Sequence, residues 1–222
     1  MAAELLAQQQ VAVSAIFGIE RWADENAALL RPFLEKFNVV SEAELKKISS
    51  LTTPNRVLVV AELPERPFSP AILQDDFCFY LDGIQDPGNL GTILRVADWF
   101  GIPAVVCSPD CVDAFSPKVV QASMGAFLRV GIREMPLEQL LENTSGLPVA
   151  GAVLGGENLF QTDLPANGVL VIGSEGRGIS AAAEARLTHR LTIPRGPAGG
   201  AESLNAAVAA GICAAALRNL SI

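Results

Sequence analysis

Glycine-rich and polar loops follow three apolar segments of this sequence, and they hold the candidate catalytic and ligand-binding residues. The three segments with their loops span residues 82–101, 170–180 and 191–212. Glycines let the backbone approach a ligand closely, so such loops are typical of sites that hold a nucleotide or a related molecule. Taken singly, each loop could equally be a tight turn between a strand and a helix.

Several classes of site are disfavoured. The loop GSEGRG from Gly173 resembles a nucleotide-binding loop, but its glycines do not follow G-x-G-x-x-G, and no G-x-x-x-x-G-K-[ST] occurs in the chain. A catalytic triad could use only His189, the single histidine, which we interpret as a connector between a helix and a strand. The cysteines lack the spacing of a zinc site and are expected to be free thiols: Cys78, Cys107, Cys111 and Cys213.

The predicted elements on either side of these loops alternate between strands and helices. Strands alternating with helices predict a parallel α/β sheet, and ligands bind beyond the carboxyl ends of its strands, where the three loops lie. The predicted strands are 77–81, 104–107, 149–154, 169–172 and 191–193, and the predicted helices are 92–100, 180–187 and 203–217.

The first part of the chain reads as a small separate α/β domain. Ser41 with Glu44 three residues later predicts a capping box at the start of a helix. Three prolines among charges in 63–74 indicate a linker, so we expect domains at 1–68 and 69–222. The other predicted elements of the first domain are strands at 11–17, 38–40 and 57–60 and a helix at 21–37.

Composition bounds the class of protein. The chain has 222 residues, of which 50% are hydrophobic and 18% charged, so it can bury a sizeable core and is not disordered. Apolar runs do not approach the roughly 18–20 residues that a membrane span needs, and the first residues lack the pattern of a secretory signal. We therefore expect a cytoplasmic protein without membrane partners. The net charge of −8 argues mildly against nonspecific binding to nucleic acid.

The three loops together are far more specific than each alone. They read DGIQDPGNLGTILRVADWFG, LVIGSEGRGIS and LTIPRGPAGGAESLNAAVAAGI. In this order and spacing they resemble the three motifs of the SpoU/TrmH (SPOUT) family of RNA ribose 2′-O-methyltransferases. SPKVVQASMGA at 116–126 is similar to the segment between the first two motifs. The resemblance covers roughly residues 75–220, and the preceding part resembles a shortened form of the family's substrate-binding domain.

The resemblance implies a fold, a cofactor and an assembly. The family has a parallel α/β sheet whose C-terminal part is threaded as a trefoil knot. Members are typically homodimers with active-site residues contributed across the interface. The knot loops bind S-adenosylmethionine largely through backbone groups, and no metal is needed. By position, the resemblance assigns the cofactor contacts to Gly173, Gly178, Ile193 and Leu204.

The resemblance also assigns catalytic residues: Asn89, Arg95, Glu175, Ser203 and Asn205. Arginine stays protonated in proteins, so we favour Arg95 as a clamp on the target phosphate that lowers the effective pKa of the 2′-hydroxyl. The family's proposed general-base role is the alternative. Arg95 could instead be a solvated residue on a helix face, and Ser203 could cap the last helix. The loop 195–201 is longer than is usual in the family.

The sequence thus predicts an S-adenosylmethionine-dependent methyltransferase acting on a ribose 2′-hydroxyl of RNA, with ribosomal RNA ahead of transfer RNA as substrate. A catalytically inactive relative that binds RNA or assists assembly is a second hypothesis, favoured by the acidic charge and the shortened first domain. An unrelated doubly wound enzyme with another nucleotide-derived cofactor is a third. To reconcile an RNA substrate with the net acidity, we expect arginines to gather locally at the site: Arg95, Arg129, Arg177 and Arg195.

Overall fold

The structure, a computed structural model, describes residues 1–8, 11–63, 70–142, 144 and 146–218. The chain divides into two compact units, Met1–Glu65 and Arg66–Ile222. The domain boundary expected between residues 68 and 69 lies outside the described residues. None of the described helices is long and apolar enough to cross a bilayer.

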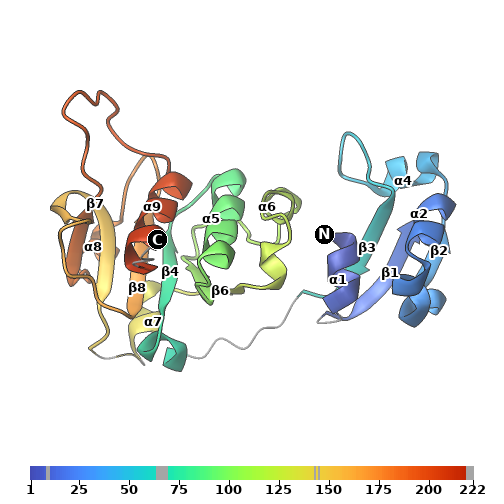
Figure 1. The fold of residues 1–222 in the computed structure, drawn as a ribbon, viewed down its shortest axis with the longest axis horizontal. Coiled ribbons are helices and arrows are strands. Elements are labelled where there is room, and N and C mark those ends of the chain that lie inside the picture. Colours follow the sequence, from blue (N-terminus) through green and yellow to red (C-terminus); the bar gives the residue numbers. More distant parts are fainter. Residues whose placement is uncertain (9–10, 64–69, 143, 145, 219–222) are drawn as a thin grey trace. The chain divides into compact units, whose positions relative to one another are not determined.

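The first unit is a three-stranded sheet with order β2-β1-β3, covered by short helices (Figure 1). Strand β1 pairs in parallel with β2 and antiparallel with β3. Its core holds Leu6, Ile16, Trp22 and Leu30. The elements are α1 (Ala2–Gln8), β1 (Val13–Gly18), α2 (Glu20–Glu25), α3 (Ala27–Leu30), the 3-10 helix η1 (Arg31–Lys36), β2 (Phe37–Val39), α4 (Glu42–Ile48) and β3 (Val57–Ala61).

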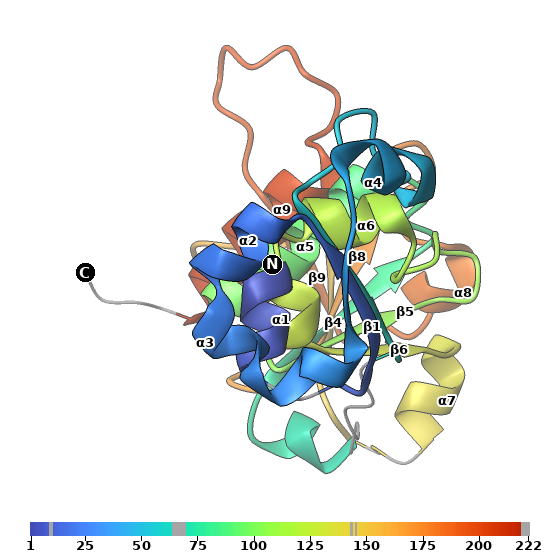
Figure 2. The ribbon, with the colours of Figure 1, turned by 90° about the vertical axis from the view of Figure 1, so that its right-hand side faces the viewer.

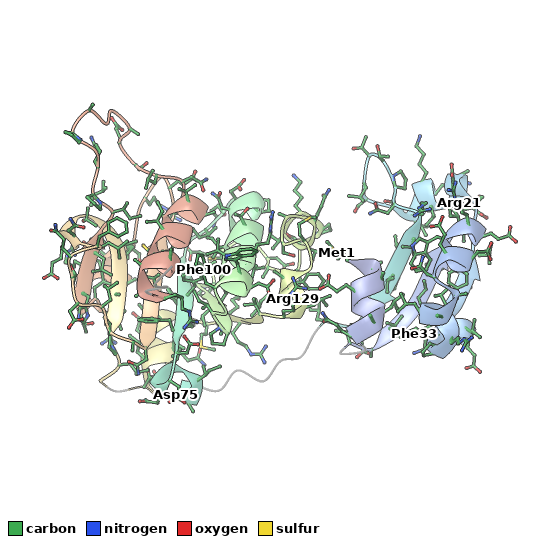
Figure 3. All side chains as sticks on the ribbon, viewed as in Figure 1. Met1, Arg21, Phe33, Asp75, Phe100 and Arg129 are labelled. Carbon is green, nitrogen blue, oxygen red and sulfur yellow. The ribbon has the colours of Figure 1, made fainter. Side chains whose placement is uncertain are left out.

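Two local predictions for this unit have different outcomes. The capping box is confirmed, because the Ser41 hydroxyl accepts from the Glu44 N–H at 3.3 Å and the Glu44 carboxylate accepts from the Ser41 N–H at 2.8 Å. The single helix expected over 21–37 is wrong: α2 ends at Glu25, and the next residue, Asn26, has a φ of −123° that is not helical. Beyond it, Pro32 removes a backbone donor, and residues 31–36 form a 3-10 helix, in the part of the unit where Figure 3 labels Phe33.

The second unit is a parallel six-stranded sheet with order β6-β5-β4-β8-β7-β9. This confirms the predicted α/β class, although β6 and α7 were not predicted. The helical elements are η2 (Pro70–Gln74), α5 (Pro87–Trp99), α6 (Pro117–Ala122), η3 (Ala126–Leu128), α7 (Leu137–Glu142), α8 (Ala181–Glu184) and α9 (Ala206–Arg218). The strands are β4 (Phe77–Asp82), β5 (Ala104–Cys107), β6 (Gly131–Glu134), β7 (Val149–Asn158), β8 (Gly168–Gly173) and β9 (His189–Thr192).

Helices cover both faces of this sheet, which explains its apolar central strands. Every residue of β4 is buried, as is usual for parallel strands covered on both faces. Cys78 and Tyr80 pack in one cluster with Leu137 and Leu140 of α7 and Ala183 of α8. Side chains alternate along a strand, so the neighbours of Cys78 and Tyr80 in β4 point to the opposite face, that of α5 and α9 (Figure 2).

The helix α9 is also anchored at its C-terminal end. Arg218 pairs with Asp76 at 2.8 Å and donates to the carbonyl oxygen of Phe100 at 2.8 Å (Phe100 is labelled in Figure 3). The Arg218 side chain thus ties the last helix to the residue that follows α5 and to the residue that precedes β4. The trefoil knot implied by the family resemblance stays a prediction.

Two helices start at residues that were not predicted, and both starts bear on the site. Helix α5 begins at Pro87 rather than near residue 92, because Asp86 caps it by accepting from the Asn89 N–H at 2.8 Å and proline suits the first helical position. Helix α9 begins at Ala206, after Asn205, whose side-chain oxygen accepts from the N–H of Ala207 at 3.0 Å. Each start therefore carries an asparagine.

Candidate functional site

Side chains from all three motifs meet in one cluster. The Glu175 carboxylate accepts a hydrogen bond from the Asn89 side-chain amide at 2.9 Å and a second from the Asn205 amide. Asn205 also donates to the side-chain oxygen of Asn89 at 2.8 Å. The backbone N–H of Ala206, at the start of α9, lies 3.4 Å from the same Glu175 oxygen. We call Asn89, Glu175 and Asn205 the motif cluster.

The sheet explains why residues so distant in sequence come together. Strands β4 and β8 are neighbours, with Asp82 in register with Gly173, so the loops that follow them leave the same edge of the sheet. The buried Asp82 also connects the end of β4 to the start of α8, because its carboxylate accepts a hydrogen bond from the Ser180 N–H at 2.6 Å. Asp82 was not among the predicted residues, since a carboxylate at a strand end has no distinctive sequence signal.

The loop after β8 is closed by its own backbone. Ser174 and Gly178 exchange N–H···O bonds of 3.1 and 2.8 Å, and Gly178 has φ +69°, which favours glycine. A Cβ on Gly173 would lie 2.2 Å from the carbonyl carbon of Gly178. Gly173 is thus a position with no room for a side chain, and Gly178 is one whose backbone conformation favours glycine.

Arg95 and Ser203 lie outside the motif cluster. Arg95 follows Asn89 by six residues on α5, which is about 240° of rotation, so it projects from another side of the helix. It is exposed, and its side chain makes no hydrogen bond or ion pair with any residue that the structure describes. Ser203 is exposed three residues before α9, and the expected cap of that helix is made by Asn205 instead.

The remaining predicted cofactor contacts flank the long segment between β9 and α9. Ile193 follows β9 directly and is half-buried, while Leu204 precedes α9 and is 45% exposed. The segment between them projects away from the sheet (Figures 1 and 2). Ile193 and Leu204 therefore lie at the two ends of this segment, one directly after β9 and the other shortly before α9.

Two of the arginines expected at the site carry acidic partners. Arg129, labelled in Figure 3, pairs with Asp98 at 2.8 Å, and Arg177 lies 3.5 Å from Asp110. Their charges are therefore partly balanced inside the chain. Of the four arginines expected at the site, Arg95 and Arg195 are the two that are exposed without an acidic partner among the described residues, so their charges are available to an RNA phosphate.

A separate hollow of about 490 Å³ lies between β7 and β9, and none of the predicted residues lines it. Several of its polar side chains already have partners, since Arg190 pairs with Glu184 at 2.6 Å and His189 Nδ1 lies 2.8 Å from the Thr188 hydroxyl. His189 is the first residue of β9, so its interpretation as a connector is wrong. Within the described parts of the chain, no cluster of His, Cys, Asp and Glu could hold a metal ion.

Comparisons with known proteins match both the sequence and the fold. The profile of the SpoU rRNA Methylase family matches residues 76–215. The 23S rRNA (guanosine(2553)-2′-O)-methyltransferase RlmP of Bacillus subtilis is 32% identical over 184 residues, covering 81% of this chain and 71% of the relative. An uncharacterized tRNA/rRNA methyltransferase of Synechocystis is 33% identical over 198 residues, covering 86% of this chain and 71% of the relative.

Solved structures extend the likeness to nearly the whole chain. A TrmH-family protein from Porphyromonas gingivalis has a TM-score of 0.84 and 39% identity, covering 99% of this chain and 87% of that one. An AdoMet-bound rRNA methyltransferase from Sinorhizobium meliloti shares the fold with a TM-score of 0.83 at 24% identity, covering 99% of this chain and 85% of that one.

Proposed function

Because this chain belongs to the SpoU rRNA methylase family, we propose that it transfers a methyl group from S-adenosylmethionine to a ribose 2′-hydroxyl of ribosomal RNA. The observation that carries this proposal is the motif cluster, in which the polar residues of three separate motifs share hydrogen bonds. The names of relatives such as RlmP, a 23S rRNA methyltransferase, favour ribosomal over transfer RNA.

The residues present fit the cofactor. Gly176 and Gly178 carry no side chain, and a Cβ built on either would meet nothing within 4 Å, so a ligand can approach the backbone at these two positions. Ile193 and Leu204 offer apolar surface for an adenosyl group. When bound, S-adenosylmethionine supplies a methyl group on a positively charged sulfur.

The chain's own residues then position the acceptor. Glu175 holds the amides of Asn89 and Asn205 in one orientation, and amides so fixed can bind the ribose next to the methyl group. Substitution at the methyl carbon needs the oxygen, carbon and sulfur in line, so this positioning supplies much of the rate. Arg95 binds the phosphate of the target nucleotide and lowers the pKa of the 2′-hydroxyl, with general-base action as the alternative role.

The two parts of the chain have different roles in this proposal. Residues 69–222 carry the methyltransferase site, and residues 1–68 bind RNA. In support of the second role, the first unit presents exposed Lys46 and Lys47 in the last turn of α4, next to the polar segment 49–56. Such cations contact phosphates without reading sequence. The enzyme acts in the cytoplasm, where its substrate is assembled.

The active form is a homodimer built on α5 and α9. Trp99 is 85% exposed on α5 and Val208 is 50% exposed on α9, and these helices pack together, with a Cβ on Gly211 lying 3.8 Å from Val96. Arg95 precedes Trp99 by four residues and so shares its face of α5. Pairing two copies through this face would bring Arg95, whose side chain has no partner among the described residues of its own chain, toward the site of the other copy.

Replacing Trp99 by glutamate is expected to convert the dimer to monomers, because the interface would then bury an unpaired charge. Sedimentation velocity measures the change, and methyl transfer should fall with it. Phe160→Glu is the matched control, since Phe160 is 61% exposed after β7. A dimer that survives Trp99→Glu would contradict this interface.

Titration calorimetry with S-adenosylmethionine tests the proposed function first, with S-adenosylhomocysteine alongside. We expect about one site per chain, followed by methyl transfer to a ribose of ribosomal RNA, mapped by resistance of the methylated position to alkaline cleavage. Absence of binding at millimolar ligand in folded protein would leave the RNA-binding relative as the better hypothesis. Binding of another nucleotide instead would favour the unrelated doubly wound enzyme.

A further inference from the structure

Two cysteines lie together at the start of the first motif, where neither was given a role. Cys107 ends β5 and pairs in register with Leu81 of β4. A turn then brings the chain back, with the Cys111 N–H donating to the Ser108 carbonyl at 3.0 Å. As a result the Cys111 thiol lies 3.2 Å from the carbonyl oxygen of the same Leu81. Both cysteines therefore border one residue at the end of β4.

The Cys111 sulfur is built into the loop that leads to Asn89. It donates to the Leu81 carbonyl oxygen and accepts from the Ile84 N–H at 3.3 Å. The same loop is held by the Gly83 N–H, which donates to the Ser108 hydroxyl at 2.9 Å. Displacing this sulfur would therefore loosen the backbone of residues 81–84, which precedes the cap of α5.

The electrostatic setting distinguishes this thiol from the others. A hydrogen bond from Cys107, with further ones from Ser108 and backbone N–H groups, lowers the pKa of Cys111 to about 7, and that of Cys107 is raised in return. Burial raises the pKa of Cys78 and of Cys213 to about 12. Because the thiolate is the nucleophile, Cys111 is the reactive cysteine at neutral pH, and it is partly accessible to solvent.

We propose that Cys107 and Cys111 form a redox modification site, in which a peroxide converts them to a disulfide that displaces the first-motif loop and slows methyl transfer. The Cys111 thiolate attacks one peroxide oxygen, giving a sulfenic acid and releasing hydroxide. The Cys107 thiol then attacks the Cys111 sulfur, and its proton leaves with the sulfenic oxygen as water. In sum, two thiols lose two electrons and two protons, and hydrogen peroxide becomes two waters.

The disulfide would act on catalysis through position. In the disulfide, Cys111 has no thiol proton to donate to the Leu81 carbonyl oxygen, and its sulfur moves away from the Ile84 N–H that it accepts from in the reduced chain. Misplacing a substrate-orienting group by about 1 Å can cost about 10²-fold in rate, and Asn89 lies five residues beyond Ile84. Thiol reductants would restore the reduced loop.

The chemical test does not depend on the proposed activity. The folded full chain is treated with hydrogen peroxide, its remaining thiols are blocked, and it is digested with trypsin without reduction. Arg95 and Lys118 bracket both cysteines, so the disulfide appears as one peptide lighter by about 2 Da. Two of the four free thiols should disappear, and Cys111→Ser should prevent this while Cys213→Ser should not.

The functional test compares methyl transfer before oxidation, after it, and after dithiothreitol. We expect a loss of about 10²-fold that the reductant reverses in the natural chain and that is absent in Cys111→Ser, which lacks the thiolate that peroxide oxidises. Circular dichroism checks that each variant folds. If no disulfide forms, or if it forms without changing the rate, the proposal is overturned. A chain inactive even when reduced would instead count against the proposed function, while the mass shift would still stand.

Discussion

Replacing Arg95 by alanine is expected to lower kcat for methyl transfer by about 10²–10³, the range found when a preorganised charge-stabilising donor is removed. The reason is that Arg95 is exposed and its side chain has no partner in the part of its own chain that the structure describes, so its charge is available for the target phosphate. The same exposure predicts an unchanged melting temperature, since exposed substitutions shift stability by within about 0.5 kcal/mol. Single-turnover methylation and thermal unfolding measure the two quantities.

Arg186→Ala is the matched control, because Arg186 is also exposed and its side chain has no partner among the described residues. It should leave kcat unchanged. Full activity of Arg95→Ala would contradict the assigned role and favour the solvated-face interpretation of this residue. An equal loss in both variants would point to a general need for positive charge.

Arg95→Lys separates the two roles of the residue. A clamp needs positive charge, so lysine should restore part of the rate with the pH profile unchanged, although it lacks the bidentate fork of arginine. A general base would instead show its own pKa in the pH–rate profile, and lysine titrates below arginine. A profile shifted to lower pH in Arg95→Lys would therefore support the general-base role.

Gly173→Ala is expected to give the largest loss of cofactor binding. The new Cβ would lie 2.2 Å from the carbonyl carbon of Gly178 and 2.4 Å from the N of Ile179, and backbone atoms cannot rotate away. Overpacking of this kind costs about 1–3 kcal/mol. Because the strain falls on the loop proposed to hold the cofactor, Kd for S-adenosylmethionine should rise by about tenfold or more, as measured by titration calorimetry.

Gly176→Ala provides the control in the same loop. A Cβ on Gly176 meets nothing within 4 Å and its φ is not in the left-handed region, so both cofactor binding and stability should be retained. Equal cofactor affinity in Gly173→Ala and Gly176→Ala would show that the closed loop is not the binding element. Denaturant unfolding separates a local effect on binding from a global loss of structure.

Local sequence signals predicted a large part of this fold. Alternating strands and helices indicated the parallel sheet, because each buried strand reads as a short apolar run. The capping box at Ser41 and Glu44 depends on residues three apart, and it was correct. The unbroken helix expected over 21–37 failed because the apolar spacing continues through Asn26, while the backbone there leaves the helical region. Strand β6 and helix α7 are short, and their weak patterns gave no prediction.

The candidate site, too, could be predicted only in part from local sequence signals. The residue types, the order of the three motifs and the glycines of the loop after β8 could be read from the sequence, since these depend on motif spacing and local backbone conformation. Which side chains meet follows from the tertiary structure. The register between β4 and β8 and the start of α9 join Asn89, Glu175 and Asn205, whereas the helical rotation between Asn89 and Arg95 separates them. Contacts between residues 86 and 116 positions apart depend on strand order, which no local pattern encodes.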